Sequence, residues 1–128
     1  MALVAALRDW LIQAGFAGQD EAALLRGLCE RMQAAGVPLL RARTGYDVLH
    51  PEVESRGHRW LRDGTADEFV SRRADEAAND AQWLFSPFHR LWQSGAASMR
   101  RRLAHDYRDG EFDLLDRFKA SGTTDYLC

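Results

Sequence analysis

The chain has 128 residues, a formal charge of -2 at pH 7 and a pI near 6.1. This length fits a single domain over residues 1–128, and ordinary proportions of apolar and charged residues exclude disordered, collagen-like and disulfide-rich classes. Because the chain has no overall excess of positive charge, it is not expected to bind nucleic acid.

Two amphipathic helices are predicted in the first part of the chain. Apolar side chains recur at helical spacing before Gly15, and again between Asp20 and Gly36. Asp20 is a typical N-cap residue and Gly36 a typical helix stop. We therefore expect a helical N-terminal part over residues 1–36.

Three strands are predicted to follow. Residues 39–49 alternate as a half-buried strand would, and a turn is expected over residues 50–57. The stretches 58–62 and 68–72 have strand composition. Asp63-Gly64-Thr65 lies between them and is typical of a hairpin turn.

The amino-acid composition changes after the predicted strands. Residues 73–82 are rich in Asp, Glu, Asn and Ala, with almost nothing large to bury, which predicts an exposed and mobile loop. Ser86 and Pro87 are typical of the first positions of a helix, and Gly95 is typical of a helix end.

The last part of the chain predicts a strand over residues 99–104, a helix from Phe112 to Gly122 and a strand over residues 123–127. This order of elements is typical of an α+β fold in which helices pack against one antiparallel sheet. The chain ends within the last strand pattern, so we expect a sheet that is incomplete at the C-terminus. Its unpaired edge should favour association or poor solubility.

Catalytic, metal-binding and phosphate-binding motifs are absent from the sequence. The chain contains no Gly-rich phosphate loop, G-x-S-x-G or H-E-x-x-H, and its four histidines are spaced too irregularly to bind one metal. Cys29 and Cys128 lack metal-site spacing, and we interpret Cys29 as a small buried apolar residue. Arg100-Arg101-Arg102 is expected to form alternating surface salt bridges. We expect no catalytic residue, metal or cofactor.

The sequence also bears on location. No apolar run reaches the length that a membrane span needs, and the apolar N-terminus is interrupted by Arg8 and Asp9. The N-terminal segment has neither a basic leader nor a cleavage site. We therefore expect a cytoplasmic protein without a membrane partner.

Aromatic side chains are numerous for a chain of this length. Core packing explains them, and so does a pocket for a small-molecule ligand, because such pockets have aromatic walls with few polar groups. The candidate ligand-binding residues are Tyr46, Trp60, Phe88 and Trp92.

Several short segments together carry a resemblance to a known family. They are residues 21–31, residues 36–39, Leu49-His50-Pro51, residues 56–60, Ser86-Pro87-Phe88 and Gly122-Thr123-Thr124-Asp125-Tyr126. In this order they resemble the N-terminal region that precedes the catalytic domain of many proteobacterial class III adenylate cyclases, a region usually regarded as GAF-like. The likeness extends over nearly the whole chain.

The resemblance implies a GAF/PAS-like fold and a regulatory or sensor role in cAMP signalling. It also implies a homodimer, since these cyclases need two protomers to form their active sites. No strand of this chain carries the paired aspartates of two-metal cyclisation, so the chain itself is not expected to be an enzyme. The alternative is a stand-alone small-molecule-binding or protein-interaction module of the same fold.

Overall fold

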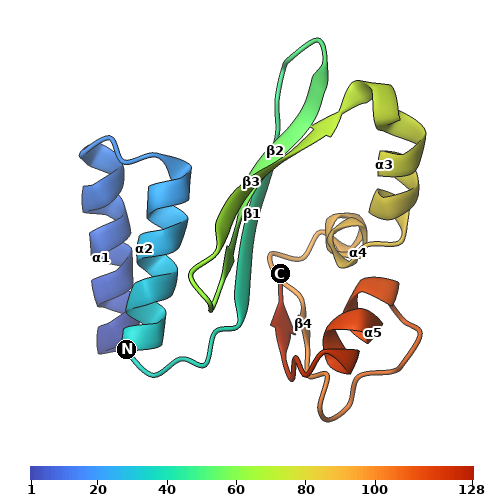
Figure 1. Cartoon of the computed structure of the whole chain (residues 1–128). Helices are drawn as coiled ribbons and strands as arrows, with labels where there is room; N and C mark the ends of the chain where they lie inside the picture. The colour runs from blue at the N-terminus through green and yellow to red at the C-terminus, as the bar shows by residue number, and fades with distance from the viewer. The chain divides into compact units, whose positions relative to one another are not determined.

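The computed structural model describes residues 1–128 and divides into two compact units, Met1–Ala74 and Asp75–Cys128 (Figure 1). Both units combine helices with antiparallel strands, which confirms the expected α+β class. None of the helices has both the length and the apolar character that crossing a membrane requires. The expectation of a single domain over residues 1–128 stays a prediction.

The first unit begins with two helices, as predicted: α1 (Ala2–Phe16) and α2 (Glu21–Ala34). The Asp20 carboxylate accepts the backbone N–H of Ala23 at 2.8 Å and so caps the start of α2. Gly36 follows the helix with a φ of +86°, a conformation that glycine adopts without strain.

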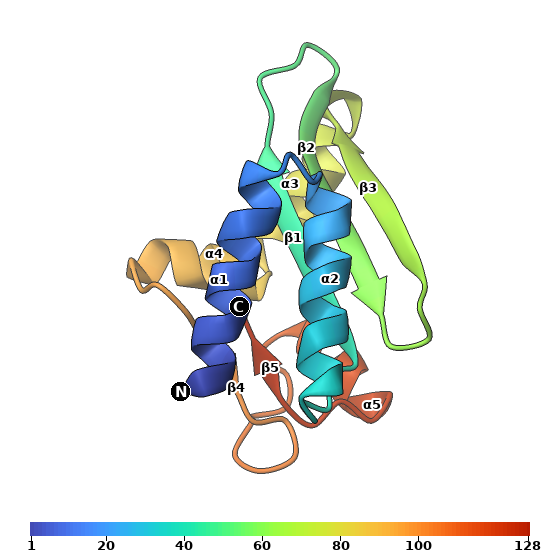
Figure 2. The same ribbon diagram turned by 90° about the vertical axis from the view of Figure 1, so that its left-hand side faces the viewer.

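Helices α1 and α2 lie side by side (Figure 2). Trp10 of α1 packs onto Gly27 of α2, where an added Cβ would lie 2.6 Å from the indole ring. The guanidinium of Arg31 lies 3.9 Å from the centroid of the same ring. The absence of a side chain at position 27 therefore lets the two helices approach closely.

The sheet of the first unit has three antiparallel strands in the spatial order β1-β2-β3: β1 (Arg41–Asp47), β2 (Val53–Leu61) and β3 (Ala66–Arg72). Three strands were predicted here, but β2 begins inside the segment expected to be a turn over residues 50–57. His50 explains the difference. Its Nδ1 accepts the backbone N–H groups of Glu52 at 3.1 Å and Val53 at 3.2 Å, which closes the turn early.

One face of this sheet packs against α2. Trp60 of β2 is 3% exposed and forms a core with Leu25 and Cys29 of α2, with Leu39 and Ala42 packed around it. Burial raises the pKa of the Cys29 thiol to about 11, so the thiol stays protonated. The interpretation of Cys29 as a small buried apolar residue is confirmed.

The opposite face of the sheet carries a close contact between a glycine and an aromatic ring. Gly57 of β2 pairs with Phe69 of β3 and with Gly45 of β1. A Cβ at position 57 would lie 2.1 Å from the carbonyl oxygen of Thr44 and 2.3 Å from the Phe69 ring. Only glycine fits at position 57 without displacing a strand or the ring.

The second unit contains three helices and two short strands: α3 (Glu76–Leu84), α4 (Pro87–Ser94), β4 (Arg100–Arg101), α5 (Asp113–Ala120) and β5 (Tyr126–Leu127). Helix α4 starts after Ser86 and ends at Gly95, as predicted, and α5 lies within the helix predicted from Phe112 to Gly122.

The prediction of an irregular loop over residues 73–82 is wrong. Residues Arg73–Asp75 form a 3-10 turn, and α3 follows directly. Most of the segment is exposed, as expected. The scarcity of large side chains showed only that little is buried there, whereas Ala, Glu and Gln are themselves good helix formers.

Strands β4 and β5 pair with each other, with Arg100 opposite Leu127 and Arg101 opposite Tyr126. Their positions agree with the strands predicted over residues 99–104 and 123–127, but each has only two residues. The expectation of one sheet is wrong, because these strands form a second sheet of their own. A turn closed by the hydrogen bond from the His105 N–H to the Arg102 carbonyl ends β4 early. Incompleteness at the C-terminus stays a prediction.

The core of the second unit consists of Leu103, Tyr107, Phe112 and Leu115. The Tyr107 hydroxyl oxygen accepts the backbone N–H of Phe112 at 3.1 Å and lies 2.9 Å from Oδ1 of Asp116. Burial raises the pKa of this phenol to about 12. Tyr107 therefore ties the segment before α5 to the helix itself.

The Gly57 contact gives a stability prediction. Gly57→Ala should lower the free energy of unfolding by about 1–3 kcal/mol, because the new methyl group has to displace a strand or the Phe69 ring. Urea denaturation followed by circular dichroism measures this. Gly45→Ala is the matched control, since its Cβ would lie 3.7 Å from Phe69, an ordinary contact. Equal losses in both variants would contradict the steric explanation.

Candidate functional site

The four candidate ligand-binding aromatics lie in different surroundings. Trp60 is buried in the core of the first unit, and Tyr46 lies partly exposed on the same face of that sheet. Phe88 and Trp92 both lie on α4 of the second unit and are exposed. Each unit therefore holds two of them, and their role in ligand binding stays a prediction.

Tyr46 belongs to a small polar cluster between α2 and the sheet. Nδ1 of His58 lies 3.6 Å from Oε2 of Glu21, and Thr44 is opposite His58 on the neighbouring strand. Partial burial and the Glu21 carboxylate, which accepts the phenol hydrogen bond, raise the pKa of Tyr46. Nδ1 of His58 and Oγ1 of Thr44 are buried without a hydrogen-bond partner in the protein. The cluster provides a polar link between the start of α2 and the strands.

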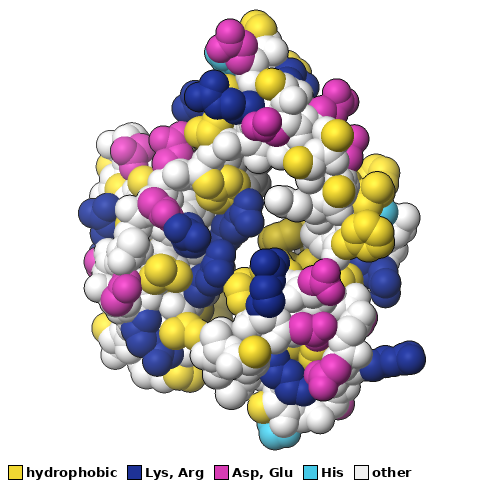
Figure 3. Space-filling model, turned by 45° about the vertical axis from the view of Figure 1, so that its right-hand side comes forward, with side chains coloured by type: hydrophobic (Ala, Val, Ile, Leu, Met, Phe, Trp, Pro, Cys, Tyr) yellow, Lys and Arg dark blue, Asp and Glu magenta, His cyan; other side chains and the backbone are white.

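The second unit exposes a group of large apolar side chains where α3 meets α4. We call this group the aromatic patch, and it consists of Trp83, Leu84, Phe85, Phe88 and Trp92. Phe85 is 76% exposed and Trp92 is 70% exposed. Figure 3, which brings this side of the chain forward, shows hydrophobic side chains gathered on the surface. Exposed apolar groups of this density are typical of sites that contact another molecule.

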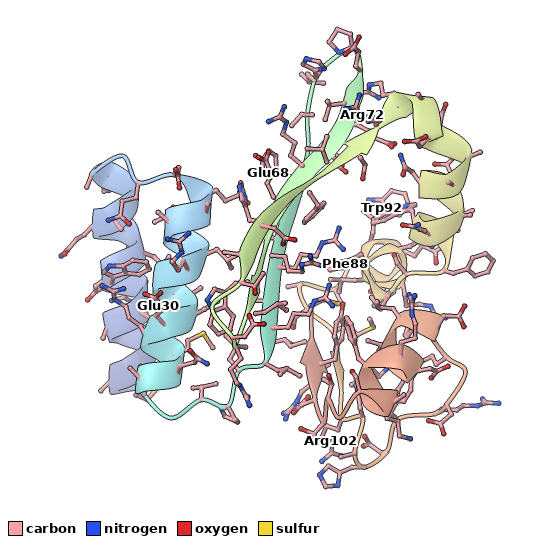
Figure 4. All side chains as sticks on the ribbon, viewed as in Figure 1. Glu30, Glu68, Arg72, Phe88, Trp92 and Arg102 are labelled. Carbon is pink, nitrogen blue, oxygen red and sulfur yellow. The ribbon has the colours of Figure 1, made fainter.

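Ser86 sets the corner that brings the patch together. Its hydroxyl donates to the carbonyl of Trp83 at 2.7 Å and accepts the N–H of His89 at 3.1 Å, so it ends α3 and starts α4. Phe88 and Trp92 are one helical turn apart and project from the same side of α4 (Figure 4). The His89 ring lies 5.6 Å from Trp83 and 6.0 Å from Trp92, between centroids. Ser86 and His89 therefore hold Trp83 and Trp92 in place.

A polar groove of about 340 Å³ adjoins the patch, between α4 and residues 110–113. In it the Glu111 carboxylate accepts hydrogen bonds from Arg101 at 2.7 and 2.9 Å, and Arg90 approaches Glu111 to 3.8 Å. Arg90 also lies over the Phe112 ring, 5.3 Å from its centroid. The hydrogen bonds from Arg101 hold the pKa of Glu111 below its usual range, so this carboxylate is ionised at neutral pH and cannot serve as a general acid.

The three consecutive arginines do not converge on one site. Each pairs with a different acidic residue, in the pairs Arg100 with Asp125, Arg101 with Glu111, and Arg102 with Asp106. The predicted alternating salt bridges are confirmed.

Sequence reasoning singled out Phe88 and Trp92 of the patch, but not its other members or the polar residues beside them. Arg90 and Glu111 are far apart in the sequence, and no local pattern connects them; only the fold of the second unit brings them together. Nor does the structure hold a group of three or more His, Cys, Asp or Glu side chains placed to bind a metal ion.

The arrangement is suited to binding another molecule. Exposed aromatic side chains next to a polar rim with Arg90 are typical of the centre of a protein interface. No protein-family model, curated protein or solved structure matches the chain. Its function therefore has to be inferred from its own residues.

The ion pair at Glu111 predicts a pH dependence. Its contribution to stability is complete above the ordinary glutamate pKa of 4.5 and is lost as the pH falls through the lower pKa of the folded state. Glu111→Gln should therefore be less stable than the parent at neutral pH, and the difference should shrink below pH 4.5. Thermal denaturation across this range measures it.

Asp109→Asn is the control for that experiment. Asp109 forms an exposed ion pair with Lys119 at 2.7 Å, and such pairs contribute little to stability. If Asp109→Asn loses as much stability as Glu111→Gln, the acid sensitivity comes from the loss of any carboxylate and not from the ion pair between Glu111 and Arg101.

Proposed function

We propose that this chain is a GAF-like regulatory domain of a class III adenylate cyclase, and that it acts on another protein domain through the aromatic patch. The observation that carries the proposal is the order of the shared segments, which runs from residue 21 to Tyr126. The domain senses or transmits a signal in the cytoplasm and leaves synthesis of cAMP to a separate catalytic domain.

The local roles of the shared segments support a regulatory assignment. Residues 21–31 lie in α2, and His50 organises the turn before β2. Ser86 starts α4, and Gly122, with a φ of +94°, precedes β5. These segments build the scaffold and do not gather acids or metal ligands. A likeness carried by scaffold residues fits a domain that is shared for its fold rather than for an active site.

The aromatic patch supports action through a protein contact. A regulatory domain changes the activity of its neighbour only if it binds the two states of that neighbour with different free energies, which requires a contact surface. Trp and Arg are the residues that most often supply large contributions at such surfaces. The patch exposes Trp83 and Trp92, and Arg90 lines the adjoining groove together with Phe85. A stand-alone interaction module would use the same surface, and the experiments below separate the two roles.

The DNA that follows codon 128 provides the first test. This DNA should encode a cyclase catalytic domain with paired metal-binding aspartates, in the same reading frame or after a frameshift. An unrelated sequence there would contradict the regulatory assignment and leave the stand-alone module as the better reading.

An activity measurement provides the second test. The 128-residue chain alone should form no cAMP from ATP. In the protein that joins this chain to its catalytic domain, Phe88→Ala and Trp92→Ala should each change the rate of cAMP formation at least about fivefold, the lower end of typical coupling. Leu49→Ala, a fully exposed apolar residue of the first unit, should leave the rate unchanged. Rates unaffected by the patch variants would rule out the patch as the regulatory contact.

A further inference from the structure

The polar groove that adjoins the aromatic patch has two opposing walls. Ser86, His89, Arg90 and Gln93 form one wall, and they share one side of α4 and its N-cap because they recur at intervals of three and four. Residues 110–113 form the other wall. The volume of about 340 Å³ lies near the lower limit of ligand pockets, which have about 300–1,000 Å³. The groove therefore has the size of a site for a small molecule.

The wall formed by residues 110–113 is held in place by hydrogen bonds. The backbone N–H of Gly110 donates to both carboxylate oxygens of Asp116, at 3.1 Å each. The N–H of Phe112 donates to the Tyr107 hydroxyl oxygen at 3.1 Å, and the Phe112 ring is buried. A wall that is fixed before a ligand arrives lowers the entropy cost of binding.

Arg90 has hydrogen-bond donors that no protein group uses. Both carboxylate oxygens of Glu111 already accept hydrogen bonds from Arg101, at 2.7 and 2.9 Å. Arg90 approaches the same carboxylate only to 3.8 Å, which is too long for a hydrogen bond, and its side chain is 55% exposed. The amide of Gln93, three residues further along α4, has no hydrogen-bond partner either. These two side chains can therefore bind a carboxylate together.

Asp113 provides a charge of the opposite sign. It is the first residue of α5 and lines the groove, and its carboxylate has neither an ion pair nor a hydrogen bond in the structure. Arg90 and Asp113 do not form an ion pair with each other, although they line the same groove. The groove thus offers one guanidinium and one carboxylate to a ligand that carries both charges.

We propose that this groove binds a free α-amino acid with an apolar side chain. Arg90 and Gln93 donate hydrogen bonds to the carboxylate of the ligand, and Asp113 accepts hydrogen bonds from its ammonium group. The apolar side chain of the ligand packs against Leu84 and Phe85, which also line the groove.

Other small ligands fit these charges less well. Phosphate and dicarboxylates would bring two negative charges close to Glu111 and Asp113. A monocarboxylate would leave Asp113 without a partner, and a simple amine would leave Arg90 without one. A chain terminus of a protein carries only one of the two charges, whereas a free amino acid carries both on neighbouring atoms. Charge complementarity therefore favours the amino acid.

Isothermal titration calorimetry of the full chain with L-phenylalanine tests the site. The parent should bind one molecule per chain, and Arg90→Gln and Asp113→Asn should each weaken binding at least about tenfold, because each removes a charge-assisted hydrogen bond. Arg102→Gln and Asp109→Asn are the matched controls, since both residues form exposed ion pairs and neither lines the groove. A parent that does not bind L-phenylalanine at millimolar concentrations, or controls that lose as much affinity, would overturn the proposal.

Two analogues of the ligand test which residue binds which charge. Hydrocinnamate lacks the ammonium group, so Arg90→Gln should weaken its binding whereas Asp113→Asn should not. Phenethylamine lacks the carboxylate, so the two variants should have the reverse effects. Equal losses for both analogues in both variants would show that the substitutions disturb the fold of the groove, and would rule out the assigned contacts.

Nuclear magnetic resonance locates the ligand. The backbone amide shifts that L-phenylalanine causes should be largest at Arg90, Gln93 and Asp113. Shifts that are largest at Trp83 and Trp92 would place the ligand on the aromatic patch and overturn the proposal. The amino-acid site does not rest on the regulatory role proposed above, because these measurements need no catalytic domain. An unrelated sequence after codon 128 would contradict the cyclase assignment and leave this site standing.

Discussion

The packing of Trp60 against Leu25 and Cys29 holds α2 on the sheet, and the rest of the first unit depends on this contact. Trp60 lies on β2, the central strand, so anchoring it fixes a strand that is hydrogen-bonded on both sides. Helix α1 is then added through Trp10, which packs on Gly27 of α2. On the opposite face, Gly57 leaves room for the Phe69 ring. The position of α1 therefore depends on α2, and the position of α2 depends on its contact with Trp60.

This role of Trp60 changes how the aromatic content of the chain is to be understood. Trp60 has a packing function, whereas Phe85 and Trp92 remain exposed at the corner that Ser86 organises. Burial of an aromatic side chain contributes to folding, while an exposed one can contribute to binding only when a partner removes it from water. The exposed aromatic side chains of the second unit are thus the ones that can bind another molecule. Beside them, hydrogen bonds from Arg101 keep the Glu111 carboxylate ionised.

The aromatic patch is bordered by a polar groove with Arg90 and Glu111, which suits a contact with a partner domain. A regulatory domain influences the activity of a neighbour only through such a contact, because it must bind the two states of that neighbour with different free energies.

The sequence by itself determined the features that act over a few residues. The N-caps at Asp20 and Ser86 and the turn at Gly64 satisfy or permit backbone geometry locally, so helices α2 and α4 and the hairpin turn were predicted correctly. Only the tertiary structure decided which aromatic residues are buried, because burial depends on packing between segments that are distant in the sequence. The same reason explains why the separate pairing of β4 with β5 and the meeting of Arg90 with Glu111 were not predicted. Helix α3 was missed for a different reason: its composition was compatible with both loop and helix, and nothing large is buried to distinguish them.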